Sequence, residues 1–193
     1  MSETFEHPYA SKALLANYVR HVEAAFESYR RGRECELKFI TNEGRGIRTY
    51  EFLAASSAFE HCISNMHRAI VCMRSIARNR VVPQPIRALF ANRPSFIKPA
   101  TADIISGIRD AVQHTFEQIA QGKIAPNSAY VLSAGGPETI VEDGEPPQTL
   151  KTFDRLSIGH HEIKFEQVKE ILVEMGDCAE RLATYNPHIS LAR

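Results

Sequence analysis

The sequence predicts an all-α single domain over residues 1–193, an antiparallel bundle of four to five helices with a small β-hairpin or meander inserted before the last helix. Four long stretches carry apolar residues every three or four positions, which is helical spacing. A segment rich in glycine and proline, at about 128–165, contains short β-prone pieces. So small a sheet cannot stand alone, so we expect it to cover one end or edge of the bundle.

The first helix is expected to begin at Ser11, which can cap it, and to run to about Arg31, with Gly32 as its end. The next segment, Glu36–Ile40, alternates weakly and is either a short strand or a frayed continuation of the helix. Residues 42–46 predict a turn. The apolar positions of this helix are Leu14, Leu15, Tyr18, Val22, Phe26 and Tyr29.

A second helix is expected from about Thr49 to Arg80, and Pro83 and Pro85 then break the pattern. Its apolar residues predict one stripe that faces a core. The segment Ile86–Phe90 is expected to form one short helical turn. The stripe consists of Phe52, Phe59, Ile63, Met66, Ile70, Met73 and Ile76 with Ala77.

The third long helix is predicted at Ile104–Gln121 and ends near Gly122. Thr101 is its expected N-cap, and Asp103 lies in the first turn, where the helix dipole favours negative charge. One arc of this helix is apolar, which predicts that this face lies against the core. The arc consists of Ile104, Ile105, Ile108, Val112, Phe116 and Ile119.

Short β-prone pieces and a final helix complete the chain. The pieces are expected at residues 130–132, 139–141, 155–158 and 162–165. The last helix, about Phe165 to Thr184, has apolar residues at heptad a and d positions, which predicts a seam that packs on other helices. These positions are 165, 168, 172, 175, 179 and 182.

The composition narrows the class of protein. Lys and Arg together number 23, and so do Asp and Glu, so any contact with RNA is expected to be local rather than a broad basic coat. The four cysteines form no C-x-x-C pair, which favours buried free thiols in a reducing compartment. Without a signal peptide pattern or a long apolar run, we expect a cytoplasmic protein with no membrane partner.

The polar face of the helix Ile104–Gln121 gathers five residues that can do chemistry: Arg109, Asp110, Gln113, His114 and Glu117. An arginine can clamp a phosphate and stabilise developing negative charge. A histidine titrates near neutrality and can move a proton. Because RNA supplies its own 2′-hydroxyl nucleophile, an Arg/His pair is sufficient for cleavage without a metal or cofactor. The alternative is an ordinary solvated helix face.

The segment Ile108–Ile119, with Arg109, Asp110 and His114, resembles the signature helix of HEPN-domain proteins, in which an arginine, a polar residue and then a histidine follow one another. The resemblance implies a helical bundle that forms a homodimer, with Arg109 and His114 of two protomers in one composite ribonuclease site. It also implies a role as a toxin or a phage-defence component, and a nucleotidyltransferase-type antitoxin as a partner.

Other arginines precede a histidine at a similar spacing, at Arg155 with His160 or His161 and at Arg181 with His188. Neither of these arginines shares a continuous predicted helix with its histidine, whereas Arg109 and His114 do. The inserted β segment departs from the minimal HEPN core.

A second basic face is predicted on the helix Thr49–Arg80, where His67, Arg74 and Arg78 share one side. These three are candidate phosphate-binding residues, and Arg87 and Arg93 can extend the patch; the alternative is a solvated face or ion pairs within the bundle. The pair His160-His161, with His7 or His188, lacks the spacing of a known metal site, so no metal is expected.

Three functions remain as hypotheses at this point. The first is a metal-independent endoribonuclease of the HEPN type that acts as a homodimer. The second is a non-catalytic helical module that binds a protein partner or RNA through the same polar face. The third is a structural or immunity-type protein in which the acidic positions matter more than Arg109.

Overall fold

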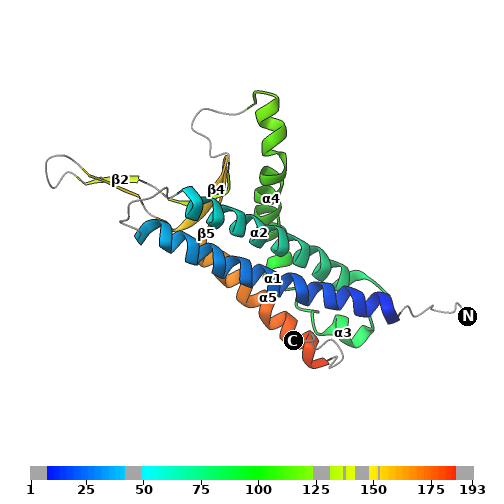
Figure 1. Ribbon diagram of the computed structural model, residues 1–193. Coiled ribbons are helices and arrows are strands. Elements are labelled where there is room, and N and C mark those ends of the chain that lie inside the picture. The colour runs from blue at the N-terminus through cyan, green and yellow to red at the C-terminus, as the bar shows by residue number, and fades with distance from the viewer. Residues whose placement is uncertain are drawn as a thin grey trace, which may run out of the picture.

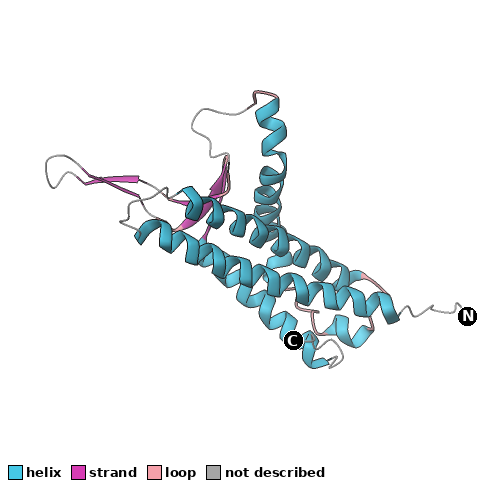
Figure 2. Ribbon diagram, in the orientation of Figure 1, coloured by secondary structure: helices cyan, strands magenta, loops and turns pink. Residues whose placement is uncertain are grey.

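The computed structural model describes residues 8–41, 49–123, 131–136, 138–141, 148–151 and 153–185. This part of the chain is mainly helical with a small antiparallel β insertion, as predicted (Figure 2). The helices are α1 (Pro8–Thr41), α2 (Thr49–Arg78), α3 (Gln84–Ala88), α4 (Pro99–Ala120) and α5 (Phe165–Tyr185), with a 3₁₀ turn, η1 (Ser95–Ile97). The strands are β1 (Ser133–Gly135), β2 (Glu138–Val141), β3 (Gln148–Lys151), β4 (Arg155–Ile158) and β5 (His161–Lys164).

The long helices are not all aligned. Helix α1 packs on α2 and α5 and runs in the direction opposite to both, whereas α4 crosses α2 and projects away from the other helices (Figure 1). Helix α1 is therefore antiparallel to α2 and to α5, whereas α2 and α5 run in the same direction and α4 departs from the predicted antiparallel bundle.

Helix α1 is longer than predicted because Gly32 does not end it. A Cβ atom at Gly32 would lie 2.5 Å from the ring of Phe59 on α2, so the missing side chain lets α2 pack directly on the α1 backbone. This contact outweighs the helix penalty of glycine, about 1 kcal/mol. The segment Glu36–Ile40 continues the helix, and Ser11 lies inside it rather than capping it. The turn predicted at 42–46 lies outside the described residues.

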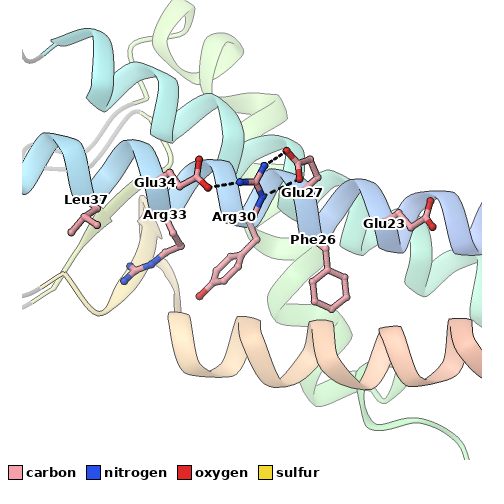
Figure 3. A pocket seen from close by; sticks show the side chains of 8 residues that line it. Glu23, Phe26, Glu27, Arg30, Arg33, Glu34 and Leu37 are labelled. Carbon is pink, nitrogen blue, oxygen red and sulfur yellow. Dashed lines mark hydrogen bonds and ion pairs between the residues drawn. The ribbon is translucent and has the colours of Figure 1, made fainter. Parts of the chain in front are cut away.

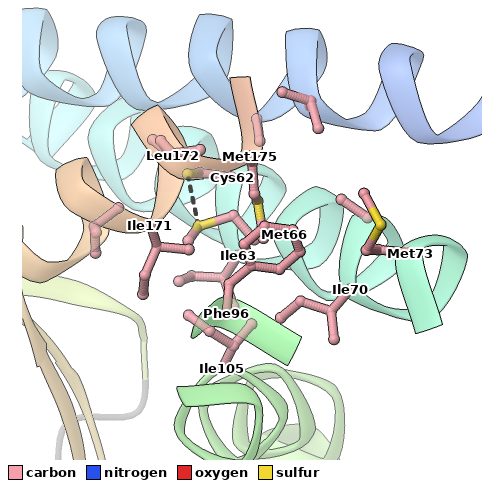
Figure 4. Close-up of a cluster of buried hydrophobic side chains, with 14 of the residues drawn as sticks. Cys62, Ile63, Met66, Ile70, Met73, Phe96, Ile105, Ile171, Leu172 and Met175 are labelled. Carbon is pink, nitrogen blue, oxygen red and sulfur yellow. Dashed lines mark hydrogen bonds between the residues drawn. The ribbon is translucent and has the colours of Figure 1, made fainter. Parts of the chain in front are cut away.

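The core is built from the stripes that the sequence predicts on α2 and α5. On α5 every predicted seam position is buried, with exposed fractions of at most 9%. Figure 4 shows side chains of α2, α5, η1 and α4 meeting in this core, among them Met66, Phe96 and Ile105. The stripe of α1 is only partly covered, because Leu15, Tyr18 and Val22 are buried while Phe26 is 39% exposed.

The β insertion forms two small antiparallel sheets. Strands β1, β4 and β5 pair in the order β1-β4-β5, and β2 pairs with β3. The predictions near 139–141, 155–158 and 162–165 correspond to β2, β4 and β5, whereas β1 begins after the predicted piece at 130–132 and β3 was not predicted. The three-stranded sheet contacts α4, α2 and α5, so it covers one end of the helical core.

The cysteines of the chain are free thiols, of which Cys62 and Cys178 are buried and Cys35 and Cys72 are half-buried. The prediction of buried thiols is therefore confirmed for two of the four. None of the described helices combines the length and the apolar character that crossing a membrane requires.

Candidate functional site

The first half of α4 packs into the core and so holds in place the second half, which carries the candidate site. Lys98 is the N-cap residue and Pro99 occupies the first turn, so Thr101 lies inside the helix and is not the cap that the sequence predicts. The side chains of Ala102, Ile105 and Ile108 are fully buried. Arg109, the first residue of the predicted Arg/His pair, directly follows Ile108 of this buried segment.

The polar face predicted on α4 is accessible. The side chains of Arg109 and His114 are 32% and 55% exposed, and Asp110, Gln113 and Glu117 are also accessible. Arg109 Nη1 donates to Asp110 Oδ1 at 2.7 Å. His114 Nδ1 lies 3.0 Å from Glu117 Oε2. Each motif side chain thus has a carboxylate partner on its own helix.

Within one chain, Arg109 and His114 do not form a joint site. They are separated by roughly 7.5 Å along the helix axis and roughly 140° around it, as expected for five residues of α-helix. Among the described residues, no hydrogen bond joins the two side chains. A site that uses both therefore needs a substrate that spans them, or a second copy of the chain.

The fold brings two further histidines to the Arg109–Asp110 pair. His67 lies on α2, close enough that the charges of Arg109 and Asp110 act on its imidazole. His161 begins β5, and a Cβ atom on Gly107 of α4 would lie 2.8 Å from its ring. The ring of His160 lies beside that of His161, with 3.9 Å between their centroids. His67 and His161 were both named as candidates from the sequence, but their position near the Arg109–Asp110 pair was not predicted.

Both imidazoles are shifted toward their neutral forms. Partial burial lowers the pKa of His67, and the positive charge of Arg109 lowers it further, while Asp110 opposes the shift. Partial burial and the neighbouring His160 lower the pKa of His161, and Asp110 again opposes the shift. An imidazole that is neutral at pH 7 can accept a proton.

The predicted phosphate-binding face on α2 is divided between two places. His67 lies near Arg109 and Asp110 of α4, whereas Arg74 and Arg78 line a pocket of about 530 Å³ further toward the C-terminal end of α2. Arg87 and Arg93 line the same pocket, as the sequence suggests.

A second pocket, of about 760 Å³, lies along α1 between Glu23 and Leu37 (Figure 3). Its cations already have partners. Arg30 is paired with Glu27 and Glu34, and Arg33 is paired with Glu36 and lies over the ring of Phe165, 4.1 Å from its centroid. The spacing of Glu27, Arg30 and Glu34 on α1 predicts these ion pairs, but no local pattern predicts the pocket itself.

Metal ligation finds no support in the described part of the chain, where no group of three or more His, Cys, Asp or Glu side chains is placed to hold an ion. The partners considered for His160 and His161, His7 and His188, lie outside the described residues.

Comparisons with protein families, with curated proteins and with solved structures found no match to this chain. The resemblance to HEPN domains therefore stands on the residues of α4.

Proposed function

We propose that the protein is a metal-independent endoribonuclease of the HEPN type, which acts as a homodimer with Arg109 and His114 at a composite site on α4. The proposal rests on one observation, the histidine side chains that lie near Arg109 and Asp110. The Arg109–Asp110 pair lies near two imidazoles from other elements. The charges of Arg109 and Asp110 act on His67, that of Asp110 acts on His161, and both imidazoles are shifted toward the proton-accepting form.

The chemistry assigns one task to each group. A neutral imidazole, that of His67, accepts the proton of the RNA 2′-hydroxyl as its oxygen bonds to the adjacent phosphorus. Arg109 stabilises the negative charge that develops on the phosphoryl oxygens. The P–O5′ bond breaks as a protonated His114 donates to the leaving oxygen. The products are a 2′,3′-cyclic phosphate and a 5′-hydroxyl end.

Exposed apolar residues on α4 support the homodimer. Ile104 and Ile119 are 39% and 49% exposed, although the amphipathic pattern assigns them to the buried face. A second copy of α4 would cover them and bring another Arg109 and His114 to the same polar face.

The test is cleavage of single-stranded RNA in EDTA by the full chain, compared with Arg109→Ala and His114→Ala. Each substitution is expected to lower the rate about 100-fold, because one loses charge stabilisation and the other proton transfer. Arg30→Ala and His61→Ala, at exposed positions away from α4, are the matched controls. Absence of cleavage by the wild type, or cleavage that survives both α4 substitutions, would disprove the proposal.

A second candidate is a non-catalytic module that binds RNA or a protein partner through the same face. The pairing of Arg109 with Asp110 and of His114 with Glu117 favours it, because both side chains already have a carboxylate partner within α4. This function predicts no turnover and RNA or partner binding that survives His114→Ala. Fluorescence anisotropy with labelled RNA, run beside the cleavage assay, separates the two functions for RNA.

A further inference from the structure

The pocket at the C-terminal end of α2 has an unusual concentration of positive charge. Five cationic side chains line it, and Asp and Glu are absent from its lining among the described residues. They come from three segments: α2, α3 with the loop that follows it, and the N-cap of α4. The five are Arg74, Arg78, Arg87, Arg93 and Lys98. Because the whole chain has a net charge of zero, this excess is local.

Two of the arginines are held in place by the backbone. Arg74 donates through Nε and Nη2 to the carbonyl of Ile97, at 3.3 and 3.0 Å. Arg87 donates through Nε to the carbonyl of Val82, at 3.0 Å. These bonds do not neutralise the guanidinium charges, and they leave other N–H groups of both arginines free to bind a ligand.

Hydrogen bonds to α5 also hold the η1 wall of the pocket in place. The carboxylate of Glu174 on α5 accepts hydrogen bonds from Ser95 and from the backbone N–H of Phe96, which fixes η1 next to the pocket. A preformed wall reduces the ordering cost of binding. Within the described residues, neither Arg78 nor Arg93 has an ion pair or a side-chain hydrogen bond, so both are available.

We propose that this pocket binds a small ligand that carries two or more phosphate groups, such as a nucleoside triphosphate. Arginine forks match phosphate oxygens in charge and geometry, and five cations exceed what one phosphate balances. A volume of about 530 Å³ suits a compact ligand, and the concave shape favours it over an extended strand. The proposal does not depend on RNA cleavage at α4.

The test is calorimetric titration of the full chain with inorganic tripolyphosphate, with ATP and with a short single-stranded RNA. Arg78→Ala and Arg93→Ala are the informative variants, because these side chains support no other polar contact among the described residues. Arg30→Ala, at the ion-paired site on α1, is the matched control, and thermal melting checks that all variants are folded.

Both tripolyphosphate and ATP are expected to bind, and each of the two substitutions is expected to weaken binding about tenfold, while Arg30→Ala leaves it unchanged. Stronger binding of ATP than of tripolyphosphate would assign the ligand to nucleotides, and equal binding to polyphosphates in general. Failure of both ligands to bind at low salt, affinity unaffected by both substitutions, or binding of the RNA alone would overturn the proposal.

Discussion

The two halves of α4 obey the same helical periodicity but have opposite surroundings. Over residues 99–108 the apolar positions Ala102, Ile105 and Ile108 are fully buried against α2 and η1. Over residues 109–120 the packing decreases: Ala111 and Val112 are still half-buried against the core, whereas Ile119 is 49% exposed and most of the polar face is accessible. The first half anchors the helix, and the second half presents chemically active side chains where a ligand can reach them.

The largest expected effect is a difference in the free energy of unfolding between substitutions in the two halves of α4. Ile105→Ala should lower the free energy of unfolding by about 2–5 kcal/mol, because it leaves a cavity in the packed core. Ile119→Ala should change it by less than about 1 kcal/mol, because the side chain is half-exposed. Urea denaturation of both variants measures the difference, and equal losses would mean that the second half is also packed.

The next effect concerns activity. Arg109→Ala should reduce RNA cleavage about 100-fold, equivalent to about 2.7 kcal/mol in the transition state, because the developing phosphoryl charge loses its partner. The same variant should unfold within about 0.5 kcal/mol of the wild type, because its ion pair is exposed. A parallel loss of stability and activity would assign Arg109 a structural role instead.

The buried carboxyl of Glu36 on α1 is expected to make the stability of the fold depend on pH. Burial raises the pKa of Glu36 to about 7 although Arg33 opposes the shift, and Glu36 Oε1 has no hydrogen-bond partner within the described structure. The folded state therefore binds this proton more tightly than the unfolded state does. Its contribution to stability is complete at low pH and is lost as the pH rises through about 7.

Glu36→Gln should accordingly stabilise the fold by about 2 kcal/mol at pH 8, and by less at pH 5. Glu117→Gln, on the open half of α4, is the control and should stay within about 0.5 kcal/mol at both values. Chemical denaturation at the two pH values measures both variants. A larger stabilisation by Glu36→Gln at pH 5 than at pH 8 would contradict the raised pKa of this carboxyl.

The smallest expected effect lies at the boundary between the halves. Gly107→Ala should change stability by no more than about 1 kcal/mol, since the gain in helix propensity offsets the contact with His161. The new Cβ would displace the His161 ring from α4 and expose it, so the pKa of this imidazole should rise toward its usual value. An NMR titration of the histidine ring protons detects the change, and an unshifted pKa would show that this packing does not cause the effect.

Local pattern was sufficient for most helices and insufficient where distant segments meet. The seam of α5 is buried as its periodicity predicts, and so is the stripe of α2 from Phe59 to Ile76, whereas its end positions Phe52 and Ala77 are half-buried. Gly32 was expected to end α1, since glycine commonly follows the last helical residue. Its actual role is to admit the Phe59 ring, and no local pattern carries that information.

The residues of the candidate sites were likewise predicted from local sequence, whereas their spatial arrangement was not. Composition and helical spacing identified Arg109, His114, His67, Arg74 and Arg78. They did not place His67 and His161 near the Arg109–Asp110 pair, because these residues lie on α2, β5 and α4 and meet only through packing. The basic pocket likewise forms because the chain turns back after α2 and brings Arg87 and Arg93 toward Arg74 and Arg78.

The amino-acid sequence by itself determined which stretches are helical, although not where α1 ends or α4 begins, and which helix faces are apolar, because periodicity is a property of neighbouring residues. Only the tertiary structure decided that Ile105 and Ile108 of the apolar arc of α4 are buried, whereas Ile104 and Ile119 of the same arc are exposed. The cause is physical: burial depends on which distant elements reach a surface, and α2 and η1 cover the buried positions of the first half of α4.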